Sequence, residues 1–103
     1  MAEQPIAGYW KVRAGQEDEF TKRWKAFTNW ALENAPGARS FTLLHNMVDT
    51  QYFISYGSFA DRDSLAAWWE MPEFDARYGH VRELCDDHVG APQELVASLT
   101  AVS

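Results

Sequence analysis

Apolar and polar positions follow two different spacings along this chain, and the first half predicts a strand followed by a helix. Residues 6–13 are rich in aromatic and β-branched side chains and end before Gly15, which predicts a strand. A helix is expected next, because acidic residues at 17–19 would lie in its first turn, where carboxylates stabilise the positive end of the helix dipole. Apolar side chains then recur at helical spacing, at Phe20, Trp24, Phe27 and Ala31. The segment Asn34-Ala35-Pro36-Gly37 is expected to end this helix.

Residues 39–47 and 51–59 form two further strand-like runs, and the polar pair Asp49-Thr50 between them predicts a hairpin. The second run is apolar on both sides. Phe53, Gly57 and Phe59 fall on one face of this strand, and Tyr52, Ile54 and Tyr56 fall on the other. This pattern is expected when neither face of a sheet is fully wet.

Two helices and a last strand are expected in the remainder of the chain. Asp61 can cap the first helix, and Pro72 is suited to the first turn of the second. The second helix is expected to carry one stripe formed by Phe74, Tyr78, Val81, Cys85 and His88. It is expected to end at 89–92, and residues 93–100 then predict the final strand.

The resulting order is β-α-β-β-α-α-β, which predicts a ferredoxin-like α+β fold with a four-stranded antiparallel sheet. The helices would cover one face of this sheet. The other apolar face would be buried most simply by the same sheet of a second copy of the chain, so we expect a homodimeric α+β barrel.

Composition and charge restrict the class of protein. A chain of 103 residues with 47% hydrophobic, 15% aromatic and 23% charged residues predicts one packed domain over 1–103. The net charge of −6 without a basic stripe argues against a nucleic-acid partner. One cysteine, Cys85, fits a reducing compartment. The start of the chain lacks a signal-peptide pattern and no run is long enough to span a bilayer, so we expect a cytoplasmic protein that does not engage a membrane.

An ordered set of features resembles the antibiotic biosynthesis monooxygenase family. These are VRAGQEDEF near residue 12, Pro36-Gly37 before the second strand, Phe59 at the end of the third, and Trp68 in the helix before the segment MPEF. The resemblance implies a dimeric α+β barrel. It also implies oxidation of an aromatic or polyketide-derived compound by molecular oxygen without a prosthetic group, whereas a related branch binds and degrades haem.

The resemblance can be carried to individual positions. In the anthrone-oxidising members, an Asn, a Trp and a Tyr occupy positions that read Ser55, Phe59 and Leu65 here. In the haem-degrading members, an Asn, a Trp and a His occupy positions that read Gly8, Trp68 and Tyr78 here. Only the Trp is retained, although tyrosinate can also ligate haem iron.

Chemistry without a cofactor needs a base beside an apolar wall, because a phenol or enol must lose a proton before it can pass an electron to oxygen. His45 or His80 would accept the proton, and Tyr78 and Ser55 would orient the substrate oxygen. Trp68, Trp69, Phe53 and Phe59 would form the wall.

Each of these side chains also has a structural interpretation. Aromatic residues at core spacing usually serve packing, and a histidine is more often structural or exposed than catalytic. Trp68 and Trp69 are about 100° apart on a helix, so one is expected in the core and the other at a cavity or dimer rim. Cys85 and His88 suggest a metal, but two ligands are too few for a closed zinc site, so no metal is predicted.

The leading hypothesis is therefore a cofactor-independent monooxygenase acting on a small aromatic, polyketide-derived or quinol-like compound. The alternative is a non-catalytic dimeric protein on the same fold that binds a small molecule or serves a stress response, with haem degradation third. Convergence of His45, His80 and Tyr78 on one cavity would favour the enzyme.

Overall fold

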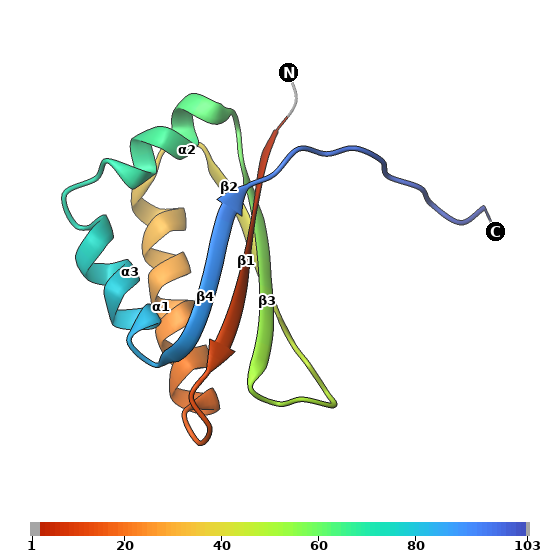
Figure 1. Ribbon diagram of the computed structural model, residues 1–103. Coiled ribbons are helices and arrows are strands. Elements are labelled where there is room, and N and C mark those ends of the chain that lie inside the picture. Colours follow the sequence, from red (N-terminus) through yellow and green to blue (C-terminus); the bar gives the residue numbers. More distant parts are fainter. Residues whose placement is uncertain (1–2, 103) are drawn as a thin grey trace.

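A four-stranded antiparallel sheet carries three helices on one of its faces (Figure 1). The structure is a computed structural model that describes residues 3–102. Its elements are β1 (Gln4–Val12), α1 (Glu17–Asn34), β2 (Ala38–His45), β3 (Tyr52–Phe59), α2 (Arg62–Trp69), α3 (Phe74–Arg82) and β4 (Cys85–Pro92). The predicted ferredoxin-like α+β fold and its element order are confirmed. The prediction of one domain over 1–103 stays a prediction, and residues 1, 2 and 103 lie outside the described residues.

The strands are ordered β2-β3-β1-β4, so β1 lies inside the sheet and pairs with both β3 and β4. In this register Trp10 lies opposite Phe53 on one side and opposite His88 on the other. Gly8 lies opposite Ser55 and Gly90 in the same way. The central strand therefore brings Ser55 of β3 and His88 of β4 to the same part of the sheet.

The predicted end of the chain is wrong in two respects. The last helix stops at Arg82 rather than continuing through His88, and the fourth strand is Cys85–Pro92 rather than residues 93–100. The spacing of Val81, Cys85 and His88 fits a helix, but the free edge of β1 offers residues 85–92 a ladder of backbone hydrogen bonds. This pairing between distant segments overrides the local periodicity.

Local signals account well for the first half of the fold and for α2. The Asp61 side chain accepts a hydrogen bond from the Ser64 backbone N–H at 2.8 Å, as expected of the residue that caps α2. Gly37 has a φ of +88°, and a Cβ atom there would lie 2.4 Å from Ser64 Oγ. Glycine is therefore needed in the turn from α1 to β2 both for its backbone conformation and for space. Pro72 lies in the turn just before α3 rather than within it.

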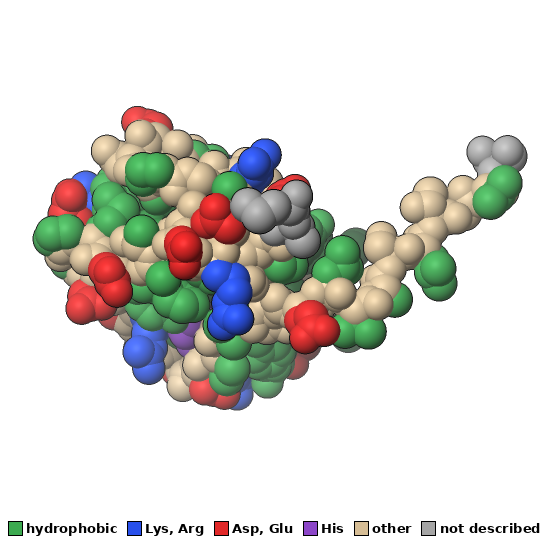
Figure 2. Space-filling view, turned by 90° about the horizontal axis from the view of Figure 1, so that it is seen from above, with side chains coloured by type: hydrophobic (Ala, Val, Ile, Leu, Met, Phe, Trp, Pro, Cys, Tyr) green, Lys and Arg blue, Asp and Glu red, His purple; other side chains and the backbone are tan. Residues whose placement is uncertain are grey.

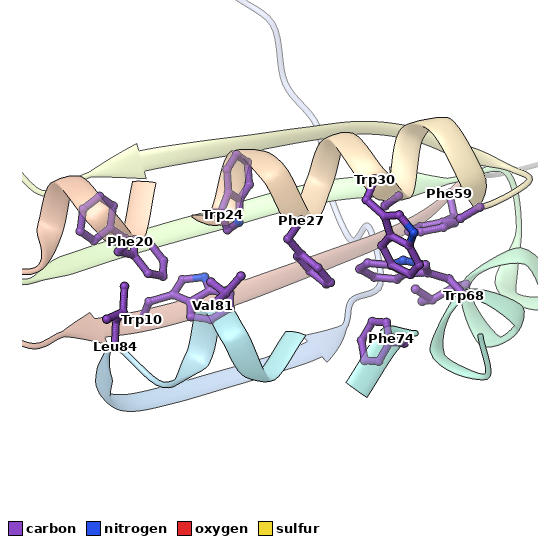
Figure 3. Close-up of a cluster of buried hydrophobic side chains, with 14 of the residues drawn as sticks. Trp10, Phe20, Trp24, Phe27, Trp30, Phe59, Trp68, Phe74, Val81 and Leu84 are labelled. Carbon is purple, nitrogen blue, oxygen red and sulfur yellow. The ribbon is translucent and has the colours of Figure 1, made fainter. Parts of the chain in front are cut away.

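The core is an unusually aromatic layer between the helices and the sheet (Figure 3). Its buried members are Trp10, Val12, Phe20, Trp24, Phe27, Trp30, Ala31, Ala35, Phe53, Phe59, Leu65, Trp68, Phe74, Val81 and Leu84. The buried indole N–H of Trp68 has no hydrogen-bond acceptor within the described residues. Aromatic rings surround the Trp68 ring, and the Phe74 ring packs edge to face against it with a centroid distance of 4.8 Å. None of the helices in residues 3–102 has the length and apolar character needed to cross a membrane.

The sheet face turned away from the helices is also apolar. Across all four strands, direct register partners form the row Leu44, Ile54, Tyr9 and Val89. Their exposed fractions are 51%, 50%, 42% and 62%, and the neighbouring Tyr56 is 50% exposed. We call these five residues the open face. By contrast, Phe53, Gly57 and Phe59 on the other side of β3 are buried, so the two faces predicted for this strand are confirmed.

Candidate functional site

A cavity of about 320 Å³ lies between the sheet and the helices, and all seven elements contribute to its wall. Most of the wall is aromatic, with Trp24 and Phe27 from α1, Trp68 from α2 and Phe74 from α3 (Figure 3). The cavity volume is near the lower end of the range of small-molecule sites, about 300–1,000 Å³. A cavity of this size and character suits one compact aromatic compound.

The polar part of the wall is a hydrogen-bonded pair, Tyr78 on α3 and His88 on β4. The Tyr78 hydroxyl contacts Nε2 of His88, and Nδ1 of His88 lies 3.1 Å from the backbone oxygen of Tyr9. A carbonyl oxygen can only accept, so Nδ1 carries the proton and Nε2 accepts from the tyrosine hydroxyl. The Trp10 ring stacks on the imidazole with a centroid distance of 3.7 Å and fixes its plane.

The environment sets the protonation state of this pair. Burial lowers the pKa of His88 below its usual 6.5, the hydrogen bond to Tyr9 opposes this shift, and the nearby positive charge of Arg82 adds to it. Burial also raises the pKa of Tyr78 above its usual 10.0. At neutral pH the imidazole is therefore neutral and the phenol is protonated. His88 can accept a proton at Nε2, which is the property required of a general base.

The lowered pKa of His88 predicts a pH-dependent stability. Below about pH 6.5 the unfolded chain protonates at His88 before the folded chain does, so the unfolded state binds more protons and the free energy of unfolding decreases as pH falls through this window. We expect His88→Gln to remove this contribution. Urea unfolding at pH 7.5 and at pH 5.5 measures it. Between pH 7.5 and pH 5.5 the variant is expected to lose less of its free energy of unfolding than the wild-type protein. Equal losses in both proteins would contradict a lowered pKa of His88 in the folded state.

A second polar contact lies at the centre of the sheet. The Trp10 Nε1–H donates to Ser55 Oγ at 2.9 Å. A Cβ atom at position 8 would lie 2.8 Å from Ser55 Oγ and 3.1 Å from Trp10 Nε1, so glycine on β1 leaves room for this contact. Ser55 keeps its own hydroxyl proton, which can be donated to an oxygen atom of a ligand in the cavity.

Four of the residues expected at a site do line this cavity, namely Ser55, Trp68, Trp69 and Tyr78. Trp68 is buried and Trp69 is partly exposed, in agreement with the 100° between them on α2. Phe53 and Phe59 are buried in the packed core beside the cavity, and neither contributes to its wall.

The two histidines expected to act as a base lie elsewhere. His45 is at the end of β2, where its Nε2 lies 2.7 Å from the Thr50 backbone oxygen and its ring stacks on Phe53 at 4.1 Å. His80 is on the surface of α3, with 61% of its side chain exposed, and its Nδ1 lies 3.8 Å from a Glu83 oxygen. The three residues His45, His80 and Tyr78 therefore do not converge on one cavity.

The histidine that lines the cavity is His88, rather than His45 or His80. It was expected on a helix beside Cys85, as half of a weak metal pattern, but both residues lie on β4. His88 would have been found if residues 85–92 had been assigned as a strand that pairs with β1, because this pairing puts His88 opposite Trp10. Within residues 3–102 no three His, Cys, Asp or Glu side chains are grouped to hold a metal ion. Burial raises the pKa of the Cys85 thiol to about 11, so this thiol is a poor nucleophile.

The residues present do not fit a haem. Tyr78, which the haem-degrading branch would place at the iron, has its hydroxyl engaged by His88 within the wall of the cavity. The cavity volume of about 320 Å³ suits a compact ligand rather than a large macrocycle. No role for haem follows from this geometry.

Comparison with known proteins agrees with this picture of the fold. The model of a family described as antibiotic biosynthesis monooxygenase matches residues 6–77. A search of curated protein sequences gives no significant match. Among solved structures, SnoaB, a cofactor-independent oxygenase from Streptomyces nogalater, has a TM-score of 0.86 at 17% identity, covering 98% of this chain and 100% of SnoaB.

Two putative antibiotic biosynthesis monooxygenases are also similar at 17% identity. The protein from Caulobacter crescentus has a TM-score of 0.79 and covers 92% of this chain and 91% of its own. The protein from Nitrosomonas europaea has a TM-score of 0.76 and covers 88% of each chain. At this identity the structural likeness establishes the fold.

Proposed function

Because this chain belongs to the antibiotic biosynthesis monooxygenase family, we propose that it is a cofactor-independent monooxygenase that oxidises a small aromatic or quinol-like compound with molecular oxygen. The observation that carries this proposal is the Tyr78–His88 pair in the wall of a mostly aromatic cavity. The description of SnoaB as a cofactor-independent oxygenase supports the same reaction class.

The first proposed step is removal of a proton from a substrate hydroxyl or enol. The substrate donates to the Tyr78 oxygen while the Tyr78 proton moves to Nε2 of His88. The net result is a substrate anion, a neutral tyrosine and an imidazolium. Stacking on Trp10 and the bond from Nδ1 to Tyr9 hold the imidazole in the required tautomer throughout.

The second proposed step uses the substrate as the source of electrons. The anion passes one electron to O₂, and the resulting substrate radical and superoxide combine to form a carbon–oxygen bond. Cleavage of the O–O bond with loss of water then converts a CH₂ carbon and one O₂ into a carbonyl group and one H₂O. All four electrons come from the substrate, so the reaction needs no separate reductant or prosthetic group.

The walls of the cavity have two roles in this proposal. Phe27, Trp68 and Phe74 offer ring faces and edges against which an aromatic substrate can stack. They also exclude water, which would otherwise protonate the anion and weaken every electrostatic contact in the site. The Ser55 hydroxyl would hold a second oxygen atom of the substrate and fix its orientation.

The proposal includes a two-fold homodimer formed through the open face. The row Leu44, Ile54, Tyr9 and Val89 is an apolar surface that crosses the whole sheet, and Tyr56 extends it. A monomeric protein rarely exposes such a continuous surface. Packing two such faces against each other would bury both and give the α+β barrel expected from the sequence pattern.

Oxygen uptake by the purified protein tests the enzyme assignment. The panel contains anthrones, naphthols and hydroquinones, each with a blank that lacks protein to correct for autoxidation. We expect uptake above the blank for at least one compound. Quenching of tryptophan fluorescence, measured in parallel, reports binding, because Trp10, Trp24 and Trp68 line the cavity.

A binding protein without catalysis is the second candidate. It is favoured by Ser55, Phe59 and Leu65, which occupy positions where anthrone-oxidising relatives carry Asn, Trp and Tyr. This candidate predicts saturable quenching of tryptophan fluorescence with no oxygen uptake from the same compound. That combination would overturn the oxygenase assignment and leave the cavity as a ligand-binding site.

A further inference from the structure

Two glycines, Gly8 and Gly90, face each other where β1 and β4 pair. They are direct register partners, and both line the cavity. We propose that Gly90 is a positioning residue for His88, because the missing side chain at position 90 leaves the space in which the imidazole lies and reaches Tyr78. This inference rests on the role proposed for His88 and adds a residue on which that role depends.

A side chain at position 90 would crowd the edge of the His88 ring that accepts the proton. A Cβ atom there would lie 3.2 Å from His88 Nε2 and 3.3 Å from His88 Cε1, whereas the next nearest atom, the Ala7 backbone oxygen, would be 3.8 Å away. Atoms in contact are usually about 3.5–4.0 Å apart. Even one methyl group at position 90 therefore displaces the ring from the place where it meets the Tyr78 hydroxyl.

The backbone itself does not require glycine at position 90. Within residues 3–102 only Gly15 and Gly37 have a positive φ, so an L-residue with a side chain fits the conformation of Gly90. Gly90 is also exposed on β4, an edge strand, where glycine weakens the strand because it has no side chain to pack and loses more conformational freedom on folding. The space needed by the His88 ring is the reason that the structure offers for this glycine.

Gly57 on β3 shows the opposite case. A Cβ atom at position 57 would lie 2.4 Å from the backbone oxygen of Ser40 on the paired strand β2, so this glycine is needed for the sheet itself. At Gly90 the obstacle is the end of a side chain, which can rotate away. A substitution at position 90 is therefore expected to leave the fold intact and to move the histidine.

Gly8 gives the neighbouring polar contact its space in the same way. The atoms closest to a Cβ at position 8 are Ser55 Oγ and Trp10 Nε1, which bond to each other, and the Trp10 ring stacks on His88. The glycine pair therefore gives room to three polar atoms of the cavity, one each from Ser55, Trp10 and His88.

Position 90 can accept a larger side chain without burying it. Gly90 and Ala91 both line the cavity and are exposed. Figure 2 looks down on the end of the molecule at which β4 finishes in Figure 1, and a histidine side chain is visible there between hydrophobic side chains. Variants at this edge therefore test the position of His88 rather than the packing of the core.

Nitrogen-15 NMR of the three histidines tests the positioning in the protein without substrate. In the wild-type protein at pH 7.5, His88 is expected as one tautomer with its proton on Nδ1, because Nδ1 faces the Tyr9 backbone oxygen and Nε2 faces the Tyr78 hydroxyl. In Gly90→Ala the two ring nitrogen signals of His88 are expected to move toward each other, because a displaced ring exchanges between both tautomers. The spectrum of His88→Gln identifies the signals.

Gly79→Ala on α3 is the matched control for this measurement. It makes the same change at a glycine whose added Cβ would meet no atom outside its own helix within 4 Å. The His88 signals should therefore stay at their wild-type positions in this variant. Unchanged His88 signals in Gly90→Ala would overturn the proposal.

Stability and activity are expected to change in opposite directions from Gly90→Ala to Gly90→Val. The melting temperature should stay at the wild-type value or rise, because alanine, and still more valine, suits an exposed strand better than glycine. The kcat for oxygen uptake should fall by about tenfold or more in Gly90→Ala, and further in Gly90→Val, with a smaller change in KM, because the base is displaced from its working position. A kcat that falls only together with the melting temperature would indicate a structural role and overturn the proposal.

The NMR measurement separates failure of the positioning from failure of the proposed reaction. A displaced His88 ring with unchanged kcat would support the positioning role of Gly90 and contradict His88 as the base. A His88 ring that stays in place in Gly90→Ala would overturn the positioning role and leave the proposed reaction untouched.

Discussion

Replacement of His88 by glutamine is expected to lower kcat for oxygen uptake by about 10²- to 10⁴-fold, the range typical of losing a general base. Glutamine keeps a polar side chain of moderate size beside Trp10 but cannot accept a proton from Tyr78. Tyr78→Phe should lower kcat as well, because it removes the hydroxyl that would join the substrate to His88 in the proposed reaction. Initial rates over a range of substrate concentrations separate this loss from weaker binding.

His80→Gln is the matched control for this prediction. It makes the same chemical change on the exposed surface of α3, outside the cavity, and should leave kcat at the wild-type value. The wild-type rate should also fall on the acid side, with an apparent pKa below 6.5, because burial lowers the pKa of His88 and only the neutral imidazole can act as the base. Wild-type activity in the His88→Gln variant would show that His88 takes no part in the proton transfer.

Replacement of Ile54 by arginine is expected to raise the dimer dissociation constant by roughly 100-fold or more. Ile54 lies between Leu44 and Tyr9 in the row of register partners that crosses the open face. An arginine there would bring an unpaired charge into an apolar interface, and the cost of removing it from water opposes association. Sedimentation velocity over a dilution series measures the change.

Leu32→Arg on α1 provides the control for the dimer. Leu32 and Ile54 have similar exposed fractions, 45% and 50%, so the two substitutions add the same charge to equally accessible positions. Only the one on the open face should dissociate the dimer. Equal sedimentation of the two variants would contradict assembly through this face.

Much of the fold follows from local sequence signals. The acidic first turn and apolar spacing of α1, the Asp61 cap of α2 and the two-sided pattern of β3 each depend on residues close in the sequence, and each appears as expected. The last strand does not follow in this way. Its position is set by the free edge of β1, more than 70 residues earlier in the chain. Residues 93–100 resemble a strand locally, but the structure of residues 3–102 has no strand there.

The candidate site was only partly predictable for the same reason. Ser55, Trp68, Trp69 and Tyr78 were expected at a cavity and line one, since each belongs to an element whose position was assigned nearly correctly. His88 was missed because it belongs to the displaced strand. The proposed role of His88 depends on Trp10, which stacks on its ring, and on Tyr78, which bonds to its Nε2 atom. Both contacts follow from the pairing of β4 with β1 and from the fold, and local sequence does not reveal them.

Labelling with ¹⁸O₂ tests the proposed reaction most directly. A compound that the protein oxidises is incubated under ¹⁸O₂ in unlabelled water, and the product is analysed by mass spectrometry while H₂O₂ is assayed in the same solution. The proposed reaction predicts one ¹⁸O atom in each product molecule, the second in water, and no accumulation of H₂O₂. A product without ¹⁸O, formed together with one H₂O₂ for each O₂ consumed, would contradict a monooxygenase.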